Sequence, residues 1–458
     1  MAPPLDPLPS FDQLPLREGD PPNSAWGLWG NGPDSALGSL NYLTDELVLK
    51  TIKEEVKTGE RIGLNLPLDL FDPPLLGRAG FEQKIIDKNP LVVNDDVITF
   101  NTQGSSQWDS LRHFAYQQDK KFYNGTTQAD IHASSRTEIN GLQSWCSKGL
   151  AGRGVLIDYV SYAQRRGIEV NHFAGHAISI EDVLAIAEEQ GVEFRTGDVL
   201  FLRTGYVAAY KALDAEGRER VSTVREWCGL GQSRETTEWL WKRQFAAVVS
   251  DSPGFEVRPP TDKKWHLHPI LLAGWGTPLG ELFDLDKLAE ICAKNKRWSF
   301  FFTSAPLNYT GAVASPPNAT AVFLGKSAQL LQNLALISSQ WRQLIHNDVM
   351  VGPSGRHEVN RLVITREKPH RRRSPEAQVA GTFEQRLLAN GGTKGFVFSA
   401  RASANIFSGA MILHFEPPQP MVRDSVIVFG TPEPGICLAL GLIAMGDRGD
   451  FRDIFKEL

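Results

Sequence analysis

Several hallmarks of other protein classes are scarce in this sequence. Its 458 residues contain only four cysteines, and these form no CxxC pair. Such sparse cysteines exclude a disulfide framework and a zinc ribbon, and they predict buried free thiols. The longest apolar run, Ile436–Met445, is far shorter than the roughly 20 residues of a membrane-spanning helix. The net charge of −5 indicates no basic surface that would recruit nucleic acid or an anionic membrane.

The beginning of the chain also lacks a recognisable targeting signal. Residues 1–9 have neither the basic start nor the apolar stretch of a secretory leader. Hydrophobic residues make up 41% and charged residues 22% of the chain, which is the usual balance for a folded protein in water. We therefore expect a cytoplasmic protein that acts on a small molecule and contacts neither nucleic acid nor membrane.

Three parts of the chain differ in composition. Residues 1–25 are rich in proline and predict an N-terminal arm, whereas residues 26–325 alternate strand-like and helix-like segments and predict one catalytic α/β domain. Residues 326–458 form a C-terminal extension of unassigned fold, predicted to be partly disordered. Its basic cluster Lys368–Pro375 favours a solvated linker over a nuclear address or a nucleic-acid patch. We expect this extension to be removable at about Gly325.

Local patterns place helices and strands within residues 26–325. Ser179 and Asp182 have the spacing of a helix N-terminus, and Gly191 is suited to end that helix. Short apolar runs predict buried strands, and amphipathic segments predict further helices. The expected strands are 155–157, 199–202, 246–249 and 299–302, and the expected helices are 47–57, 236–244 and 285–294.

Three clusters carry residue types that could perform chemistry. The first holds Asp109 and His113, and the second holds His268 followed by Glu281. The third consists of the turns 201–205 and 250–254, which follow predicted strands, where α/β proteins bind ligands. Singly, such residues are more often capping pairs or core histidines. Together, carboxylates and imidazoles from separate loops are typical of a site for a divalent metal and a water.

Four segments in order resemble those of a known family. Leu37–Thr44, Val56–Glu60, Phe201–Tyr206 and His268–Leu285 resemble segments of the cyclase family, which includes bacterial-type kynurenine formamidases and isatin hydrolases. The resemblance extends to about residue 325. It implies a swivelling β/β/α sandwich, a homodimer or larger homo-oligomer, and a divalent metal cofactor.

The family motif H-x-G-T-H-x-D-x-P-x-H falls on residues 103–113, with a partial match. The resemblance implies that His113 is the catalytic residue. It implies metal ligands at five positions: Asp109, His268, Glu281, Gln107 and Gln103. The two glutamines stand where the family has histidines. Because an amide oxygen is a weaker ligand that suits hard cations, we expect Mn or Mg rather than Zn, a site with fewer ligands, or a lost metal.

The implied reaction is hydrolysis of a C–N bond in a small aromatic amide. An arylformamidase acting on N-formylkynurenine in tryptophan catabolism, or an enzyme opening an isatin-like ring, would fit the resemblance. The metal would activate a water, His113 would carry a proton, and Trp108 would stack on the substrate. Two alternatives stay open: a metal-free binding protein, and a cyclase or dehydratase of secondary metabolism.

Overall fold

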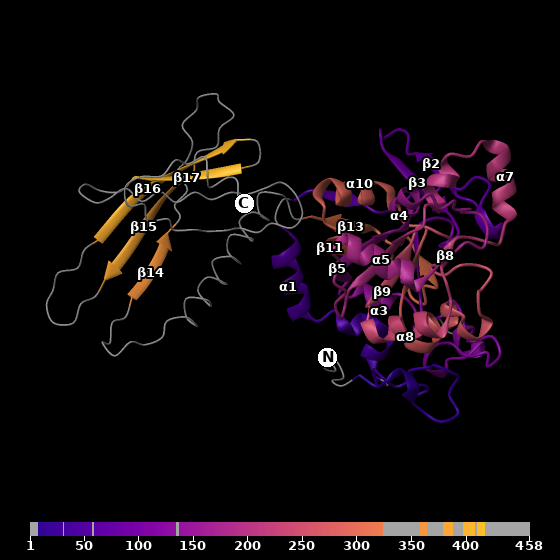
Figure 1. Cartoon of the computed structure of the whole chain (residues 1–458). Helices are drawn as coiled ribbons and strands as arrows, with labels where there is room; N and C mark the ends of the chain where they lie inside the picture. Colours follow the sequence, from indigo (N-terminus) through magenta and orange to yellow (C-terminus); the bar gives the residue numbers. More distant parts are fainter. Residues whose placement is uncertain are drawn as a thin grey trace. The chain divides into compact units, whose positions relative to one another are not determined.

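The computed structural model describes residues 8–30, 32–56, 59–133 and 137–323, and the backbone of residues 358–363, 379–387, 397–407 and 410–416. The chain divides into two compact units, Met1–Ser338 and Ser339–Leu458 (Figure 1). The predicted basic linker, the apolar run 436–445 and the cut at Gly325 lie outside the described residues.

The first unit is built on one mixed sheet of nine strands. The inner strands β5, β7, β9 and β10 run parallel to one another, and the strands on either side join them antiparallel. The order across the sheet is β1 (Arg61–Gly63), β13 (Ala319–Val322), β11 (Ser299–Ser304), β5 (Leu150–Asp158), β7 (Val199–Arg203), β9 (Ala247–Ser250), β10 (Leu279–Glu281), β4 (Gln107–Asp109) and β12 (Ala314–Ser315).

Helices connect the parallel strands, because a parallel pair needs a crossover. The helices are α1 (Asp45–Glu55), α2 (Gln128–Ile131), α3 (Gln143–Cys146), α4 (Tyr159–Arg166), α5 (Ile180–Gln190), α6 (Tyr206–Lys211), α7 (Ala215–Thr223), α8 (Arg234–Arg243), α9 (Leu267–Pro269) and α10 (Asp286–Asn295). In the described part of the chain, no helix is both long enough and apolar enough to cross a membrane. The α/β class predicted from the sequence is confirmed.

Helix α5 shows how closely local sequence sets an element. The Ser179 hydroxyl accepts a hydrogen bond from the backbone N–H of Asp182, so it caps the helix as predicted. Gly191 ends the helix with a left-handed φ of 65°, a conformation that costs glycine nothing. The following strand β7 is buried at Val199–Leu202. Both predictions are confirmed because they depend on neighbouring residues alone.

The main apolar core surrounds the parallel strands. Val155, Phe201 and Val249 are fully buried there. Cys228 and Cys292 are buried free thiols, as predicted, whereas Cys146 is half-buried.

Residues 23–30 and 32–39, here called the N-terminal strap, pack against the chain that follows α9. The backbone N–H of Ala25 donates to the carbonyl of Gly274 at 2.9 Å, and the Trp26 indole donates to Ala273 at 2.6 Å. Gly38 has a φ of +53°, and a Cβ on it would lie 1.9 Å from the carbonyl oxygen of Gly276. The strap is therefore a fitted part of the core.

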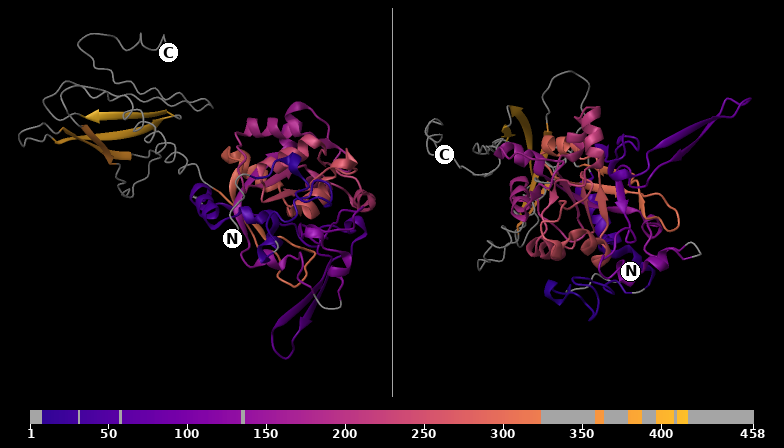
Figure 2. Two further views of the ribbon diagram at one scale, coloured as in Figure 1. Left: turned by 90° about the horizontal axis from the view of Figure 1, so that it is seen from below. Right: turned by 90° about the vertical axis from the view of Figure 1, so that its right-hand side faces the viewer.

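A two-stranded hairpin, β2 (Glu82–Asp87) and β3 (Asn94–Thr99), projects from the first unit (Figure 2, violet). Its strands and tip expose apolar side chains, and Val92 is wholly exposed. A further short parallel pair joins β6 (Ala177–Ile178) to β8 (Gly229–Leu230).

The second unit contains a four-stranded antiparallel sheet. Each strand pairs with the next along the chain, which gives a simple meander. The strands are β14 (Glu358–Val363), β15 (Val379–Leu387), β16 (Val397–Phe407) and β17 (Ala410–Glu416). The sequence patterns did not predict this sheet.

Candidate metal centre

Two paired strands bring most of the predicted ligands together. In the antiparallel register of β4 and β10, Gln107 lies opposite Glu281 and Asp109 opposite Leu279. Alternation along a strand places Gln107 and Asp109 on one face and Trp108 on the other. Glu281 ends β10, so the cluster lies at the carboxyl edge of the parallel strands, where α/β folds collect their ligands.

Trp108 does not line this cluster. Its side chain is 0% exposed, and its indole N–H donates to the Ser304 hydroxyl at 2.9 Å. The ring packs edge-on against Phe283, with centroids 5.3 Å apart, and fills the space above Gly280. The substrate-stacking role predicted for Trp108 is therefore corrected, because strand alternation turns the ring into the core.

Asp109 and His113 are neighbours, as their spacing suggested. Asp109 is fully buried, and its Oδ2 lies 3.8 Å from His113 Nε2. The Gln103 amide nitrogen donates to Asp109 Oδ1 at 2.7 Å and lies 3.2 Å from His113 Nε2. Burial lowers the pKa of His113 below its ordinary 6.5, against the attraction of Asp109. His113 is therefore a neutral imidazole near neutral pH.

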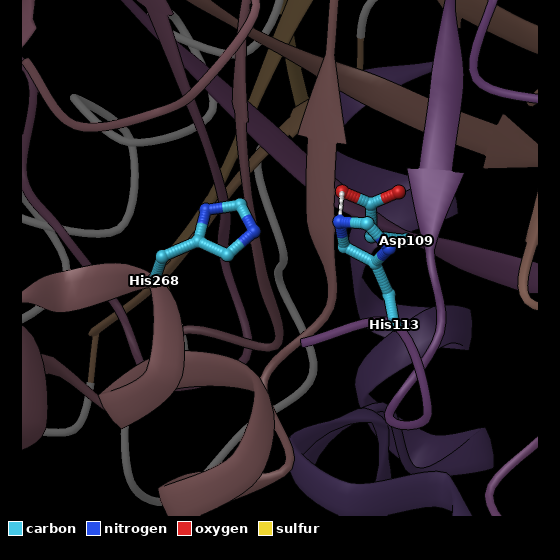
Figure 3. Close-up of side chains that lie close together, drawn as sticks. All are labelled: Asp109, His113 and His268. Carbon is cyan, nitrogen blue, oxygen red and sulfur yellow. Dashed lines mark ion pairs between the residues drawn. The ribbon is translucent and has the colours of Figure 1, made fainter. Parts of the chain in front are cut away.

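His268 reaches the same place from α9. Figure 3 shows its ring pointing toward Asp109 and His113, which come from the other side of the site. One ligand atom from each of these residues lies within 4.8 Å of the other two. His268 Nδ1 is 3.0 Å from an oxygen of Glu256 and 4.0 Å from Glu281 Oε1. Four of the predicted site residues therefore converge.

The carboxylates of Asp109 and Glu281 have no arginine or lysine partner among the described residues, and the nearest basic groups are the imidazoles of His113 and His268. Asp109 Oδ2 and Glu281 Oε1 are buried without a hydrogen-bond partner. Burial and the charge of Asp109 raise the pKa of Glu281 well above its ordinary 4.5. Burial alone would lower the pKa of His268, but Glu256, helped by Glu281 and Asp109, raises it to about 9. The carboxylates of Glu256, Glu281 and Asp109 thus favour the protonated form of His268, and a bound cation would satisfy the same carboxylates.

The third predicted cluster has a structural role. Asp251 accepts hydrogen bonds from the Thr204 amide at 2.6 Å, the Thr204 hydroxyl at 2.7 Å and the Gly205 amide at 2.8 Å. Burial raises the pKa of Asp251 to about 6, although these bonds oppose the rise. The contacts tie the turns after β7 and β9 together beside the site.

With this geometry established, two comparisons are informative. The model of the family described as "Putative cyclase" matches residues 43–257. A crystal structure of a novel cyclase is 30% identical, with a TM-score of 0.58, over 65% of this chain and 99% of that one. The chain belongs to this cyclase family. No curated protein matches it.

Other solved structures are more distant from this cyclase-family chain. An isatin hydrolase bound to the product analogue thioisatinate is 16% identical, with a TM-score of 0.40, over 61% of this chain and 97% of that one. A predicted metal-dependent hydrolase from Bacillus stearothermophilus is 14% identical, with a TM-score of 0.35, over 57% and 97%.

The two glutamines of the cyclase motif act as hydrogen-bond donors in this structure. Gln103 donates to Asp109, and Gln107 donates to Glu281 Oε2 at 2.5 Å. The Gln107 amide oxygen is buried with no partner. The glutamines thus hold the two carboxylates in place, and the amide oxygen of Gln107 is available as a neutral ligand.

The residues present fit a divalent cation. Asp109, Glu281 and Gln107 each have an unpartnered buried oxygen. Asp109 clusters with His268, Glu281 lies 4.0 Å from the same ring, and Gln107 contacts Glu281. Buried carboxylates with no arginine or lysine partner are costly unless a cation or a proton neutralises them. Oxygen donors outnumber nitrogen donors, which suits a hard cation such as Mn²⁺ or Mg²⁺.

Two side chains at this site were not predicted. Glu256, 4% exposed, touches His268, and Phe114 packs on the His268 ring with centroids 4.8 Å apart. Glu256 lies just after the turn 250–254 that the sequence had marked as a ligand position. Phe114 follows His113 directly, so its proximity to the site was available from the motif.

Proposed function

We propose that this chain is a metal-dependent hydrolase that cleaves the C–N bond of a small aromatic amide, in the manner of an arylformamidase. The observation that carries the proposal is the pair of unpartnered buried oxygens on Asp109 and Glu281. Asp109 clusters with His113 and His268, and Glu281 Oε1 lies 4.0 Å from His268 Nδ1. Family membership supports the same assignment.

Asp109, His268 and Glu281 would hold the metal, with Gln107 as a neutral fourth donor. When bound, a divalent cation supplies Lewis acidity that activates water and polarises an amide carbonyl. The negative charge that these side chains concentrate is what the cation would neutralise. Of the predicted set, Gln103 contributes through its contact with Asp109 rather than as a ligand.

His113 is the proton carrier in this proposal. Its lowered pKa keeps the imidazole neutral, so it can accept a proton from water and pass it to the leaving amine. Its side chain is 21% exposed, which leaves a route for substrate and proton exchange. Gln103 contacts both His113 and Asp109 and so keeps the imidazole beside the carboxylate.

Phe114 provides the aromatic surface for the substrate. The ring is half-buried, and it lies edge-on to His268 and to His266, whose centroid is 5.9 Å away. A substrate ring resting on Phe114 would stand beside His113. This arrangement favours an aromatic amide over an aliphatic one.

A substrate panel with controlled metal content tests the assignment. The protein is stripped of metal, reloaded separately with Mn²⁺, Mg²⁺ or Zn²⁺, and assayed on N-formylkynurenine, isatin and an aliphatic formamide. We expect turnover of an aromatic substrate only after reloading. Turnover by the stripped protein, or none with any substrate in a protein that binds metal, would count against a metal-dependent amide hydrolase.

One observation favours a second function, a metal-free binding protein. Both acidic ligands already receive a hydrogen bond from a glutamine amide, which partly satisfies them without a cation. A chain with this role would bind an aromatic amide with equal affinity before and after metal removal. Calorimetric titration of the stripped protein separates the two functions.

A further inference from the structure

We propose that Glu256 is the positioning residue that fixes His268 in its metal-binding orientation; this inference rests on the proposed metal-dependent function. Neither the family motif nor the comparisons assign a role to this residue. The inference concerns the ring orientation of His268 and not its protonation.

The contact between the two side chains is close and buried. His268 Nδ1 lies 3.0 Å from Glu256 Oε1, and both side chains are largely shielded from solvent, at 11% and 5% exposure. A carboxylate only accepts hydrogen bonds, so Nδ1 is the donor. The ring is therefore held with Nδ1 toward Glu256. Figure 3 shows the ring directed toward Asp109 and His113.

Glu256 is itself held by its backbone. Its carbonyl accepts a hydrogen bond from the Trp227 indole at 2.9 Å, and the residue forms a bridge with Leu230. A Cβ added to Gly229 would lie 2.5 Å from the Glu256 carbonyl carbon, so the two chain segments touch. A carboxylate anchored in this way can set the orientation of a neighbouring ring.

Other groups reach His268 less directly. Glu281 Oε1 is 4.0 Å from Nδ1, beyond hydrogen-bond distance, and Phe114 covers one edge of the ring without a polar contact. His266 approaches Glu256 only to 3.9 Å. Removing the Glu256 contact would therefore let the ring turn, because no other described hydrogen bond holds Nδ1. Changes to such supporting contacts commonly weaken metal binding by roughly 10–100-fold.

Three substitutions separate position from charge. Glu256→Gln keeps an acceptor oxygen at the same reach without the charge, Glu256→Asp keeps the charge with a shorter reach, and Glu256→Leu keeps neither. Exposed Glu169→Gln is the matched control. Each full-length variant is titrated with Mn²⁺ alone, and its metal-free form is examined by proton–nitrogen NMR for the His268 Nδ1–H.

We expect a slowly exchanging Nδ1–H in the parent and in E256Q, and its loss in E256L. Mn²⁺ affinity should fall by roughly 10–100-fold in E256L and E256D and by less in E256Q. Parent-like affinity in E256L, or tighter binding by E256D than by E256Q, overturns the positioning role. If E256L does not fold, the comparison of E256D with E256Q decides. A parent protein that binds no metal would contradict the proposed function. The exchange rate of the His268 Nδ1–H would still test the positioning role of Glu256.

Discussion

The nine-stranded sheet buries carboxylates at both ends of its parallel strands, the edge where these strands begin and the carboxyl edge where they end. The negative charge is compensated differently at the two edges. At the edge where the parallel strands begin, Glu55 and Asp198 are 2% and 1% exposed. Arg153 lies 3.3 Å from Glu55 and 2.9 Å from Asp198, and Arg297 also pairs with Glu55. Every charge in this group has a partner within the fold.

At the carboxyl edge, Asp109 and Glu281 are equally buried, and no arginine or lysine pairs with them in the described part of the chain. Their nearest partners are two glutamine amides and two imidazoles. Breaking a buried cluster whose charges are paired is costly to the fold, whereas a cluster without arginine or lysine keeps an attraction for an external cation. The comparison shows which buried acids are available for chemistry.

The largest effect should follow from removing one unpaired acid. Asp109→Asn should abolish metal binding and reduce turnover to background, because the amide supplies no charge to the cation. Metal-free stability should hold or rise, since the change relieves repulsion with Glu281. Metal content and kcat measured on one preparation test this, with exposed Asp119→Asn as the control. An Asp109→Asn variant that keeps both would show that this acid is not a ligand.

His113→Ala should lower kcat by roughly 10²–10⁴-fold while metal stays bound. Because burial lowers the His113 pKa, the base stays unprotonated into mild acid. The acid limb of the kcat/KM profile should therefore lie below pH 6.5, and it should vanish in the variant. A limb that persists unchanged in His113→Ala would assign it to another group.

A substitution in the paired cluster around Glu55 should change the stability of the protein rather than its activity. Glu55→Gln leaves Arg153 and Arg297 partly unpaired, and we expect a loss of about 3–5 kcal/mol in the free energy of unfolding. Glu54→Gln is the matched control, because the pair of the adjacent Glu54 with Arg195 is partly exposed. We expect this control to lose about 0–1 kcal/mol in the free energy of unfolding. Urea unfolding measures both. Equal losses for the two variants would erase the distinction between the edges.

Adding imidazoles to the unpaired edge should sharpen its metal choice. Gln103→His with Gln107→His should strengthen Zn²⁺ binding by about tenfold or more, since imidazole is the better zinc ligand. Zinc titration of the double variant, the parent and the exposed control Gln164→His would measure the gain. Unchanged affinity would mean that these positions support the carboxylates without facing the cation.

The smallest effect should come from removing the second unit. Ending the chain at Ser338, the boundary between the units, should leave kcat and the melting temperature of the first unit unchanged. Thermal melting and the same hydrolysis assay are the measurements. A truncated chain that precipitates, or that loses its cooperative melt, would show that the extension belongs to the core.

Local sequence patterns predict much of the secondary structure of the first unit. The Ser179 cap, the Gly191 stop and the β7 strand depend on neighbouring residues, so the sequence predicts them well. The motif also placed Asp109 and His113 together. The prediction for Trp108 was wrong because the face of the sheet on which its ring lies depends on pairing with β10. That strand lies about 170 positions further along the chain.

Contacts between distant segments explain the remaining gaps. Glu256 and His268 are connected by a loop, and the path of a loop cannot be predicted from the hydrophobic periodicity of the sequence. The amide nitrogen of Gln107 donates to Glu281, a contact between distant segments that the motif alone does not predict. The sheet of the second unit was not predicted, because its residues show only weak alternation of apolar and polar side chains.

The N-terminal strap has a consequence for how the chain folds. Its bonds join Trp26 to Ala273 and Asn23 to Trp275, across 247 and 252 positions. The strap leaves the ribosome early, but its partners are made only near the end of the first unit. Contacts between segments so far apart in the sequence slow folding, although the entropic cost of closing the loop grows only slowly with its length. During synthesis the Trp26 indole N–H therefore lacks its Ala273 acceptor until the chain after α9 has been made, although Tyr116, against which the ring packs, is made earlier.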